Sequence, residues 1–201
     1  MDILIIRHGL PHRVTKFDGT AADPELAPNG LAQAQRLADW LASEHLDAIY
    51  ASPMRRAHQT ALPLAAQFGL ELNFREGVAE WDRHSAEYIP IEEIKAAKDG
   101  TWEAFLRGEA SGPVDPLEFR ASVVDTIEEI ISAHRGQRVA VVCHGGVINA
   151  YAAHVLGLAP SVGFFHPHYT SINRIIAASS GERSIASLNE TAHLRGTGLL
   201  A

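Results

Sequence analysis

Residues 3–9 read Ile-Leu-Ile-Ile-Arg-His-Gly, and residues 139–146 read Val-Ala-Val-Val-Cys-His-Gly-Gly. Each stretch is an apolar, largely β-branched run that ends on a histidine followed by glycine, a pattern typical of buried parallel strands. Open α/β sheets place their ligands beyond the carboxyl ends of such strands. The two stretches therefore predict that His8 and His144 meet at one end of a sheet, and Arg7 beside them suggests a phosphate site.

Strand-like and helix-like stretches alternate along the rest of the chain. The first helix starts near Pro28, a residue that suits a first helical turn, and has an apolar stripe made of Leu31, Ala34, Leu37, Ala38 and Leu41. Further helices are expected over about 54–68, 119–134 and 147–156, and strands over about 1–7, 46–50, 70–74, 138–143, 171–178 and 184–188. This order predicts an α/β fold with three layers (helices, sheet, helices; αβα) and a mainly parallel central sheet. The last two strands form a hairpin that adds an antiparallel edge near the C-terminus.

The pattern loosens between residues 75 and 116, where two modest helices are expected over 91–98 and 101–107. We interpret 75–116 as a helical cap insertion over the site. Residues 1–201 are then expected to form a single domain, because a chain of 201 residues is long enough for one substantial core.

Composition restricts the classes of partner. The formal charge of −7 argues against a nucleic-acid surface, yet a few local arginines can still hold an anionic substrate. The one cysteine, Cys143, excludes an intramolecular disulfide and a cysteine metal cluster. No apolar stretch approaches the roughly 20 residues of a membrane span, and no signal peptide is visible, so no membrane contact is expected and the cytoplasm is the default location.

The first candidate catalytic residue is His8, at the end of the first strand. It can act as a nucleophile while Arg7 neutralises an anion beside it. For this short motif alone, a structural histidine next to a surface arginine is the commoner situation.

A second candidate lies where a strand passes into the helix over 54–68, near the positive end of that helix. Arg55 in its first turn can clamp a phosphate with two hydrogen bonds, and we expect Arg56 to face solvent. A later helix begins just after His144 with Gly145 and Gly146, where the backbone can approach an anion closely. We expect Cys143 to be a buried small hydrophobe and not a nucleophile.

Glu80 follows the third strand and precedes Trp81. Partial desolvation there would raise the pKa of its carboxyl and suit a proton donor, with Glu76 and Asp82 as rival acids. Eleven histidines invite a metal interpretation, but no HExxH motif or Cys/His ligand spacing appears, so neither a metal nor another cofactor is expected.

Taken together, these motifs resemble the histidine phosphatase superfamily, the phosphoglycerate-mutase-like proteins. The resemblance runs through nearly the whole chain in order: Arg7-His8-Gly9, then 26–30 leading into Gln33-Ala34, then Ser52-Pro53 with Arg55, Ala57, Gln59 and Thr60, then Glu80, and finally His144-Gly145-Gly146. Each motif is weak alone, but five in the right order form a specific pattern.

The resemblance implies a metal-independent phosphomonoester hydrolase in which His8 becomes phosphohistidine. By the same resemblance Arg7, Arg55 and His144 would hold the phosphoryl oxygens, and Glu80 would protonate the leaving oxygen and then activate water. His8 must be neutral to attack, so its other ring nitrogen should donate to a carbonyl, with the neighbourhood of Gly9 as a candidate.

The sequence departs from the common family pattern in several places. Leu10, Pro11 and Val14 replace an acid, a Ser or Thr, and a phosphate-binding asparagine, and Arg13 is a candidate substitute for the lost contact, with a solvated loop arginine as the alternative. Ala27 stands where a Ser or Thr often caps the first helix. The Gly-Trp-Glu-Gly pattern of phosphoglycerate mutases does not follow Glu80.

Two other functions stay open beside the phosphatase: a phosphoglycerate-type mutase, which the missing pattern disfavours, and a catalytically silent protein that binds a phosphorylated ligand. The expected partner in each case is a phosphorylated small molecule. His168 and His193 can approach the site from the C-terminal part or be structural. The edge of the terminal hairpin offers a surface for a homodimer.

Overall fold

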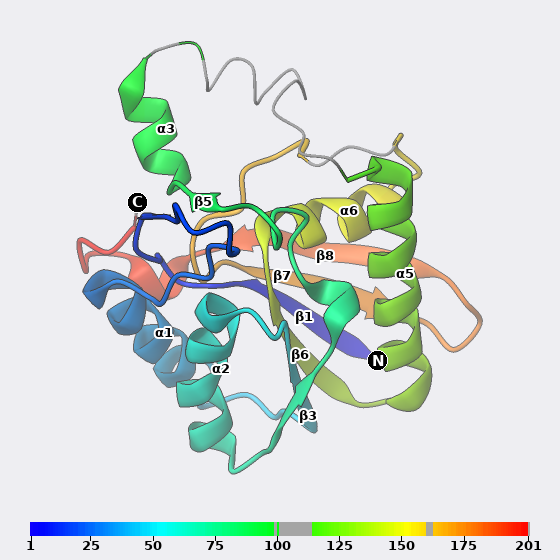
Figure 1. Ribbon diagram of the computed structural model, residues 1–201. Coiled ribbons are helices and arrows are strands. Elements are labelled where there is room, and N and C mark those ends of the chain that lie inside the picture. The colour runs from blue at the N-terminus through cyan, green and yellow to red at the C-terminus, as the bar shows by residue number, and fades with distance from the viewer. Residues whose placement is uncertain (99, 101–113, 160–162, 201) are drawn as a thin grey trace.

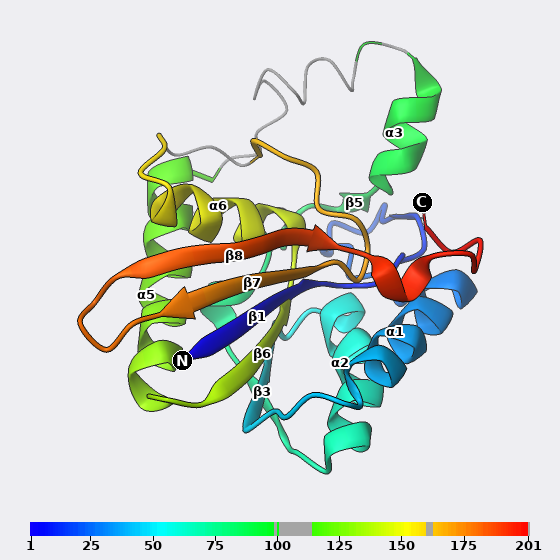
Figure 2. The ribbon, with the colours of Figure 1, turned by 180° about the vertical axis from the view of Figure 1, so that it is seen from behind.

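The computed structural model describes residues 1–98, 100, 114–159 and 163–200. Its centre is a six-stranded sheet with the strand order β4-β3-β6-β1-β7-β8 (Figures 1 and 2). The strands are β1 (Asp2–Arg7), β3 (Ala48–Ala51), β4 (Leu72–Phe74), β6 (Arg138–Cys143), β7 (Ile172–Ala177) and β8 (Arg183–Glu190). The first four of these pair in parallel, whereas β7 runs antiparallel to both β1 and β8. The predicted sheet and its antiparallel edge are confirmed.

Helices cover both faces of this sheet, which confirms the three layers. Helices α1 (Pro28–Leu41) and α2 (Arg55–Phe68) lie on one face, and α5 (Pro116–Ala133) and α6 (Gly145–Val155) lie on the other (Figures 1 and 2). The residues of β1 alternate between the two cores. Leu4 and Ile6 pack with α1 and α2, whereas Ile3 and Ile5 pack with α5 and α6. Because both faces are buried, the strand is apolar throughout.

The start of α1 agrees with the sequence: Ala27 makes no side-chain cap hydrogen bond and Pro28 occupies the first turn. The predicted stripe is wrong at Leu31, whose side chain is exposed. The buried face instead includes Gln33. Its amide accepts from the backbone N–H of Leu10 at 2.8 Å and donates to the carbonyl of Leu199 at 2.8 Å, so a polar residue is satisfied in the interior.

The loop after β1 lies directly against α1 and α2. A Cβ on Gly30 would stand 2.0 Å from the carbonyl oxygen of Leu10, so only glycine allows this approach. The Gly9 backbone N–H donates to Thr60 Oγ1 at 2.9 Å. Gln59 Oε1 accepts the backbone N–H of Leu26, just before α1, at 2.7 Å. The polar motif residues of α2 therefore fix the loop that follows His8.

Within 75–116, the described elements are a 3-10 turn (Glu76–Val78), strand β5 (Glu87–Tyr88) and helix α3 (Ile91–Ala97). Strand β5 pairs with β2 (Val14–Thr15) in a small antiparallel sheet, and α3 stands beyond it, away from the four helices that cover the main sheet (Figure 1). The helix expected over 101–107 lies outside the described residues. No helix in the described part of the chain is long and apolar enough to cross a bilayer.

Candidate active site

The two strand-end histidines lie side by side. In the pairing of β1 with β6, Arg7 stands opposite Cys143, so His8 and His144 follow at the same edge of the sheet. The ring centroids of the two histidines are 5.1 Å apart, and both side chains are buried. The register of two parallel strands thus produces the pair that the sequence predicts.

His8 is held as a neutral imidazole with a defined tautomer. Its Nδ1 lies 2.7 Å from the Gly9 carbonyl oxygen, which can only accept, so Nδ1 carries the proton and Nε2 keeps its lone pair. Burial, followed by the positive charges of Arg56 and Arg7, lowers the pKa of His8 well below its ordinary value. The ring is therefore neutral near pH 7 and presents an unprotonated nitrogen.

His144 has one satisfied and one unsatisfied ring nitrogen. Its Nε2 lies 2.8 Å from Ser52 Oγ, whereas its Nδ1 is buried without a hydrogen-bond partner among the described residues. The next residue, Gly145, begins α6, and a Cβ there would lie 3.8 Å from Arg7 Nε, so the start of this helix borders the same space. The preceding Cys143 is buried, and burial raises the pKa of its thiol, which fits the expected inert role.

Arg7 is anchored at one end and unsatisfied at the other. Its Nη1 donates to the Pro167 carbonyl at 2.6 Å, and its guanidinium carbon lies 4.0 Å from the centroid of the Tyr169 ring. Its Nε is buried without a partner within the described chain. The side chain therefore has a fixed position and a free N–H.

The structure corrects the prediction for Arg55. Its side chain is about half exposed, and its guanidinium pairs with Glu25 rather than with the histidines. Its backbone N–H donates to Asp23 at 3.0 Å. Arg55 thus joins the start of α2 to the preceding loop on the outside of the molecule.

Arg56, which we expected to face solvent, is 1% exposed. Its Nη2 donates to Asp82 Oδ1 at 3.0 Å, and its guanidinium carbon lies 4.6 Å from the centroid of the Tyr88 ring. Its Nε and Nη1 are buried and have no partner among the described residues. Spacing along the helix explains the error, because Arg56 shares the buried face of α2 with Thr60 and Leu64, four and eight residues on.

Glu80 is the buried carboxyl group of the site. Its Oε2 accepts the Gly146 N–H at 2.9 Å, and its Oε1 accepts the Trp81 N–H at 3.2 Å. Burial, together with the nearby charge of Asp82, raises the pKa of Glu80 to about 7. The carboxyl can therefore exchange a proton near neutral pH, as a general acid and base must.

The two rival acids are engaged elsewhere. Asp82 is the ion-pair partner of Arg56, and the Glu76 side chain is 79% exposed with its carboxylate 3.7 Å from Arg83. Of the three carboxyl groups, Glu80 is the buried one, and burial raises its pKa.

Arg13, the candidate substitute for the missing phosphate contact, pairs with two carboxylates instead. Its guanidinium lies 3.4 Å from Glu93 and 3.8 Å from Glu87, and the side chain is about half exposed. This geometry supports the alternative of a solvated loop arginine that ties the loop to the segment before α3.

His193 and His168 contact Thr170 and His166, respectively, in the C-terminal part of the chain. His193 Nε2 lies 3.0 Å from Thr170 Oγ1, and burial lowers the pKa of this histidine to about 4. The Thr170 N–H donates in turn to the His8 carbonyl at 3.3 Å, so His193 supports the backbone at His8. The His168 ring lies beside His166, with centroids 5.6 Å apart.

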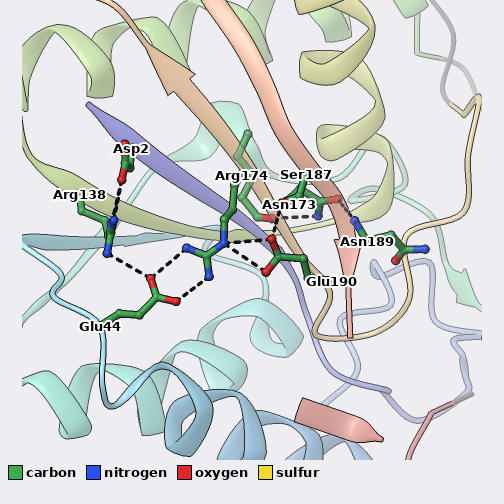
Figure 3. Close-up of polar contacts among 9 residues, drawn as sticks. Asp2, Glu44, Arg138, Asn173, Arg174, Ser187, Asn189 and Glu190 are labelled. Carbon is green, nitrogen blue, oxygen red and sulfur yellow. Dashed lines mark hydrogen bonds and ion pairs between the residues drawn. The ribbon is translucent and has the colours of Figure 1, made fainter. Parts of the chain in front are cut away.

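Asn189 clamps the segment that carries Pro167 and Tyr169. Its side-chain oxygen accepts the His168 N–H at 2.7 Å, and its side-chain nitrogen donates to the His166 carbonyl at 3.2 Å. Its own N–H donates to Asn173 Oδ1 at 2.9 Å, so the clamp is tied to β7 (Figure 3). The contacts of Arg7 with this segment therefore rest on a rigid support.

A second network joins the end of α1 to the sheet (Figure 3). Arg174 pairs with Glu44 at 2.6 Å and with Glu190 at 3.1 Å, while Arg138 pairs with Glu44 at 3.2 Å and with Asp2 at 2.7 Å. Each of these five charged side chains is paired within the network, so we assign the network a structural role.

Three guanidinium N–H groups, on Arg7 Nε, Arg56 Nε and Arg56 Nη1, and the His144 ring nitrogen Nδ1 thus remain without partners among the described residues of the site. Sequence reasoning missed Arg56 and also Tyr169, whose ring centroid is 5.7 Å from that of His8. Leaving a buried donor unsatisfied costs about 1–3 kcal/mol, and more when it is charged, so these atoms fit a site for an anion. No group of three or more potential metal ligands occurs among the described residues.

Comparisons with known proteins place the chain in a family. The sequence profile of the histidine phosphatase superfamily (branch 1) matches residues 3–191, and the chain belongs to this family. Phosphoserine phosphatase 1 of Hydrogenobacter thermophilus is 28% identical over 198 residues, which cover 96% of this chain and 93% of the relative. The metal-independent phosphoserine phosphatase of Arabidopsis thaliana is 29% identical over 160 residues, covering 74% and 66% respectively.

A solved structure agrees with this placement. The crystal structure of phosphoserine phosphatase from Entamoeba histolytica in complex with 3-phosphoglyceric acid superposes with a TM-score of 0.74 at 25% identity. The match covers 96% of this chain and 98% of the Entamoeba chain. This chain and the Entamoeba enzyme therefore share the fold over nearly their full lengths.

Proposed function

We propose that this chain is a metal-independent phosphomonoester hydrolase in which His8 carries the phosphoryl group as phosphohistidine. The observation that carries the proposal is the set of unpartnered buried donors on Arg7, Arg56 and His144 around a neutral imidazole. Dianionic phosphate supplies the acceptors that these donors lack. The phosphoserine phosphatases among the relatives support the hydrolase class.

In the first step, the lone pair on His8 Nε2 attacks phosphorus and the bond from phosphorus to the ester oxygen breaks. Protonated Glu80 gives its proton to the leaving oxygen. In the second step, the Glu80 carboxylate takes a proton from a water molecule while the water oxygen attacks phosphorus. The bond between phosphorus and His8 Nε2 breaks, which releases phosphate and restores His8.

Two cationic side chains and a neutral histidine act in both steps, since burial lowers the pKa of His144 well below its ordinary value. Arg7, Arg56 and His144 hold the non-bridging oxygens, and Arg56 takes the role that the resemblance suggested for Arg55. The Gly145 N–H at the start of α6 is a further donor to the same oxygens. Because these groups are buried and fixed before substrate arrives, they stabilise the developing charge with little reorganisation.

Hydrolysis of p-nitrophenyl phosphate in the presence of EDTA tests the proposal. We expect the rate of the wild-type protein to be unchanged by EDTA, because side chains supply all the positive charge. A rate that EDTA abolishes and a divalent metal restores would contradict metal independence. Phosphate binding by a folded protein without any turnover would favour the silent binding protein.

Glu80→Gln tests the proton donor. We expect kcat/KM for an alkyl phosphate, whose leaving group needs protonation, to fall about 100-fold or more, and the value for p-nitrophenyl phosphate to fall far less. In the wild type, kcat/KM for the alkyl ester should decline as pH rises through about 7, since the acid form of Glu80 is lost there.

Glu76→Gln is the matched control, because this exposed carboxylate lies in the same stretch of chain. It should keep both rates and the pH profile. Equal losses for good and poor leaving groups in Glu80→Gln would show that Glu80 is not the acid.

A further inference from the structure

Beyond the side chains proposed to bind phosphate lies a buried carboxylate that the proposed reaction does not use. Glu92 on α3 has both side-chain oxygens buried, and neither has a hydrogen-bond partner among the described residues. His166 Nε2 lies 3.8 Å from Glu92 Oε1, too far for a hydrogen bond. This His166 nitrogen is buried and unpartnered as well.

Glu92 carries a negative charge in this position. Burial opposes ionisation, but His166 and, at longer range, Arg7 keep the pKa of Glu92 below its ordinary value. The contact with Glu92 favours the charged form of His166, yet burial, Arg7 and Lys95 outweigh it and the pKa of His166 is lowered. Among the described residues, the group 3.8 Å from the carboxylate is therefore an imidazole whose charged form is disfavoured.

The carboxylate is linked to the proposed reaction centre through Tyr169 and Arg7. Tyr169 connects the two places: its ring lies under the Arg7 guanidinium and beside His8, and its hydroxyl is buried without a hydrogen-bond partner in the described chain. The side chains of Tyr169 and Arg7 both contribute to the lowered pKa of Glu92. The part of a substrate that extends from the phosphate past Tyr169 would meet Glu92.

An unpaired buried anion is costly, and a cationic ligand group removes that cost. We propose that Glu92 binds a primary ammonium group of the substrate, so that the enzyme selects phosphomonoesters of the O-phospho-amino-acid type. The inference rests on the proposed function, because it assumes that the phosphate lies at His8. A hydroxyl group could donate a hydrogen bond here but would leave the charge of Glu92 uncompensated.

O-phosphoserine and 3-phosphoglycerate form a matched pair of probes, since they differ mainly in an ammonium group in place of a hydroxyl. We expect wild-type kcat/KM to favour O-phosphoserine, and Glu92→Gln to reduce the ratio of the two values about 10- to 100-fold, the range for a lost hydrogen bond to a charged group. Glu93→Gln, which removes an exposed carboxylate from the same helix, should leave the ratio unchanged.

Two results would overturn the inference: a wild-type preference for 3-phosphoglycerate, or equal losses for both esters in Glu92→Gln. Turnover of p-nitrophenyl phosphate reports separately on the proposed hydrolase function. If no ester is turned over, calorimetric binding of both probes to the wild-type protein and to Glu92→Gln still decides the matter. Selective loss of O-phosphoserine affinity would support the ammonium site, and unchanged relative affinity would refute it.

Discussion

The His8→Ala variant should lose turnover of every phosphomonoester by at least about 1,000-fold, because the step that it removes is covalent. The fold should survive, since the strand that presents His8 is held by pairing with both β6 and β7. Steady-state hydrolysis of p-nitrophenyl phosphate, with a thermal melt of each protein, measures both effects.

His12→Ala is the matched control for this variant. His12 lies four residues further on, in an exposed part of the loop, and should be replaceable with near wild-type activity. If His8→Ala is folded and retains more than about a tenth of the wild-type rate, the nucleophile is not His8.

The second large effect distinguishes two adjacent arginines. Arg56→Ala should reduce kcat/KM about 100- to 1,000-fold, the usual range for removing one preorganised donor to developing negative charge. Arg55→Ala should change it less than about threefold, because the Arg55 guanidinium pairs with Glu25 at the surface. Kinetics on the two single variants measures the difference directly.

Arg56→Ala leaves Asp82 without its buried partner, so loss of fold must be separated from loss of function. Arg56→Lys keeps a positive charge in the interior but not the planar guanidinium with its remaining N–H groups. We expect it to be folded and still strongly impaired. A larger kinetic defect in the Arg55 variant than in either Arg56 variant would restore the assignment made from sequence.

The parts of the fold that follow from local pattern could be predicted. Two apolar runs that end on His-Gly placed His8 and His144 together, because parallel strands in register bring their carboxyl ends to one edge. The hydrogen bond between His8 Nδ1 and the Gly9 carbonyl was expected from the need for a neutral nucleophile. Glu80 stood out because a carboxyl next to Trp81 was expected to be desolvated.

The errors have physical causes. Leu31 and Arg56 were placed on the wrong faces of their helices, because the sequence alone did not show which stripe would pack on the sheet. In α2 the signal was present: the buried Thr60 and Leu64 stand four and eight residues after Arg56. In α1 the buried face includes a polar residue, Gln33, whose loop partners are not visible in a helical pattern.

Other features depend on long-range contacts that no local pattern shows. Tyr169 reaches His8 from a segment about 160 residues away, and the position of Glu92 relative to His166 depends on where α3 lies beyond β5. The single-domain organisation, the role of 75–116 as a cap, the cytoplasmic location and the homodimer stay predictions.

The most direct test of the account is detection of the phosphoryl-enzyme. Wild-type protein would be mixed with p-nitrophenyl phosphate, quenched in alkali, where phosphohistidine survives, and analysed by peptide mass spectrometry. We expect one added phosphoryl group on His8 that is absent from His8→Ala and that accumulates further in Glu80→Gln, where water is no longer activated. Continued turnover with no phosphoryl group on His8, or with the group on another residue, would contradict the account.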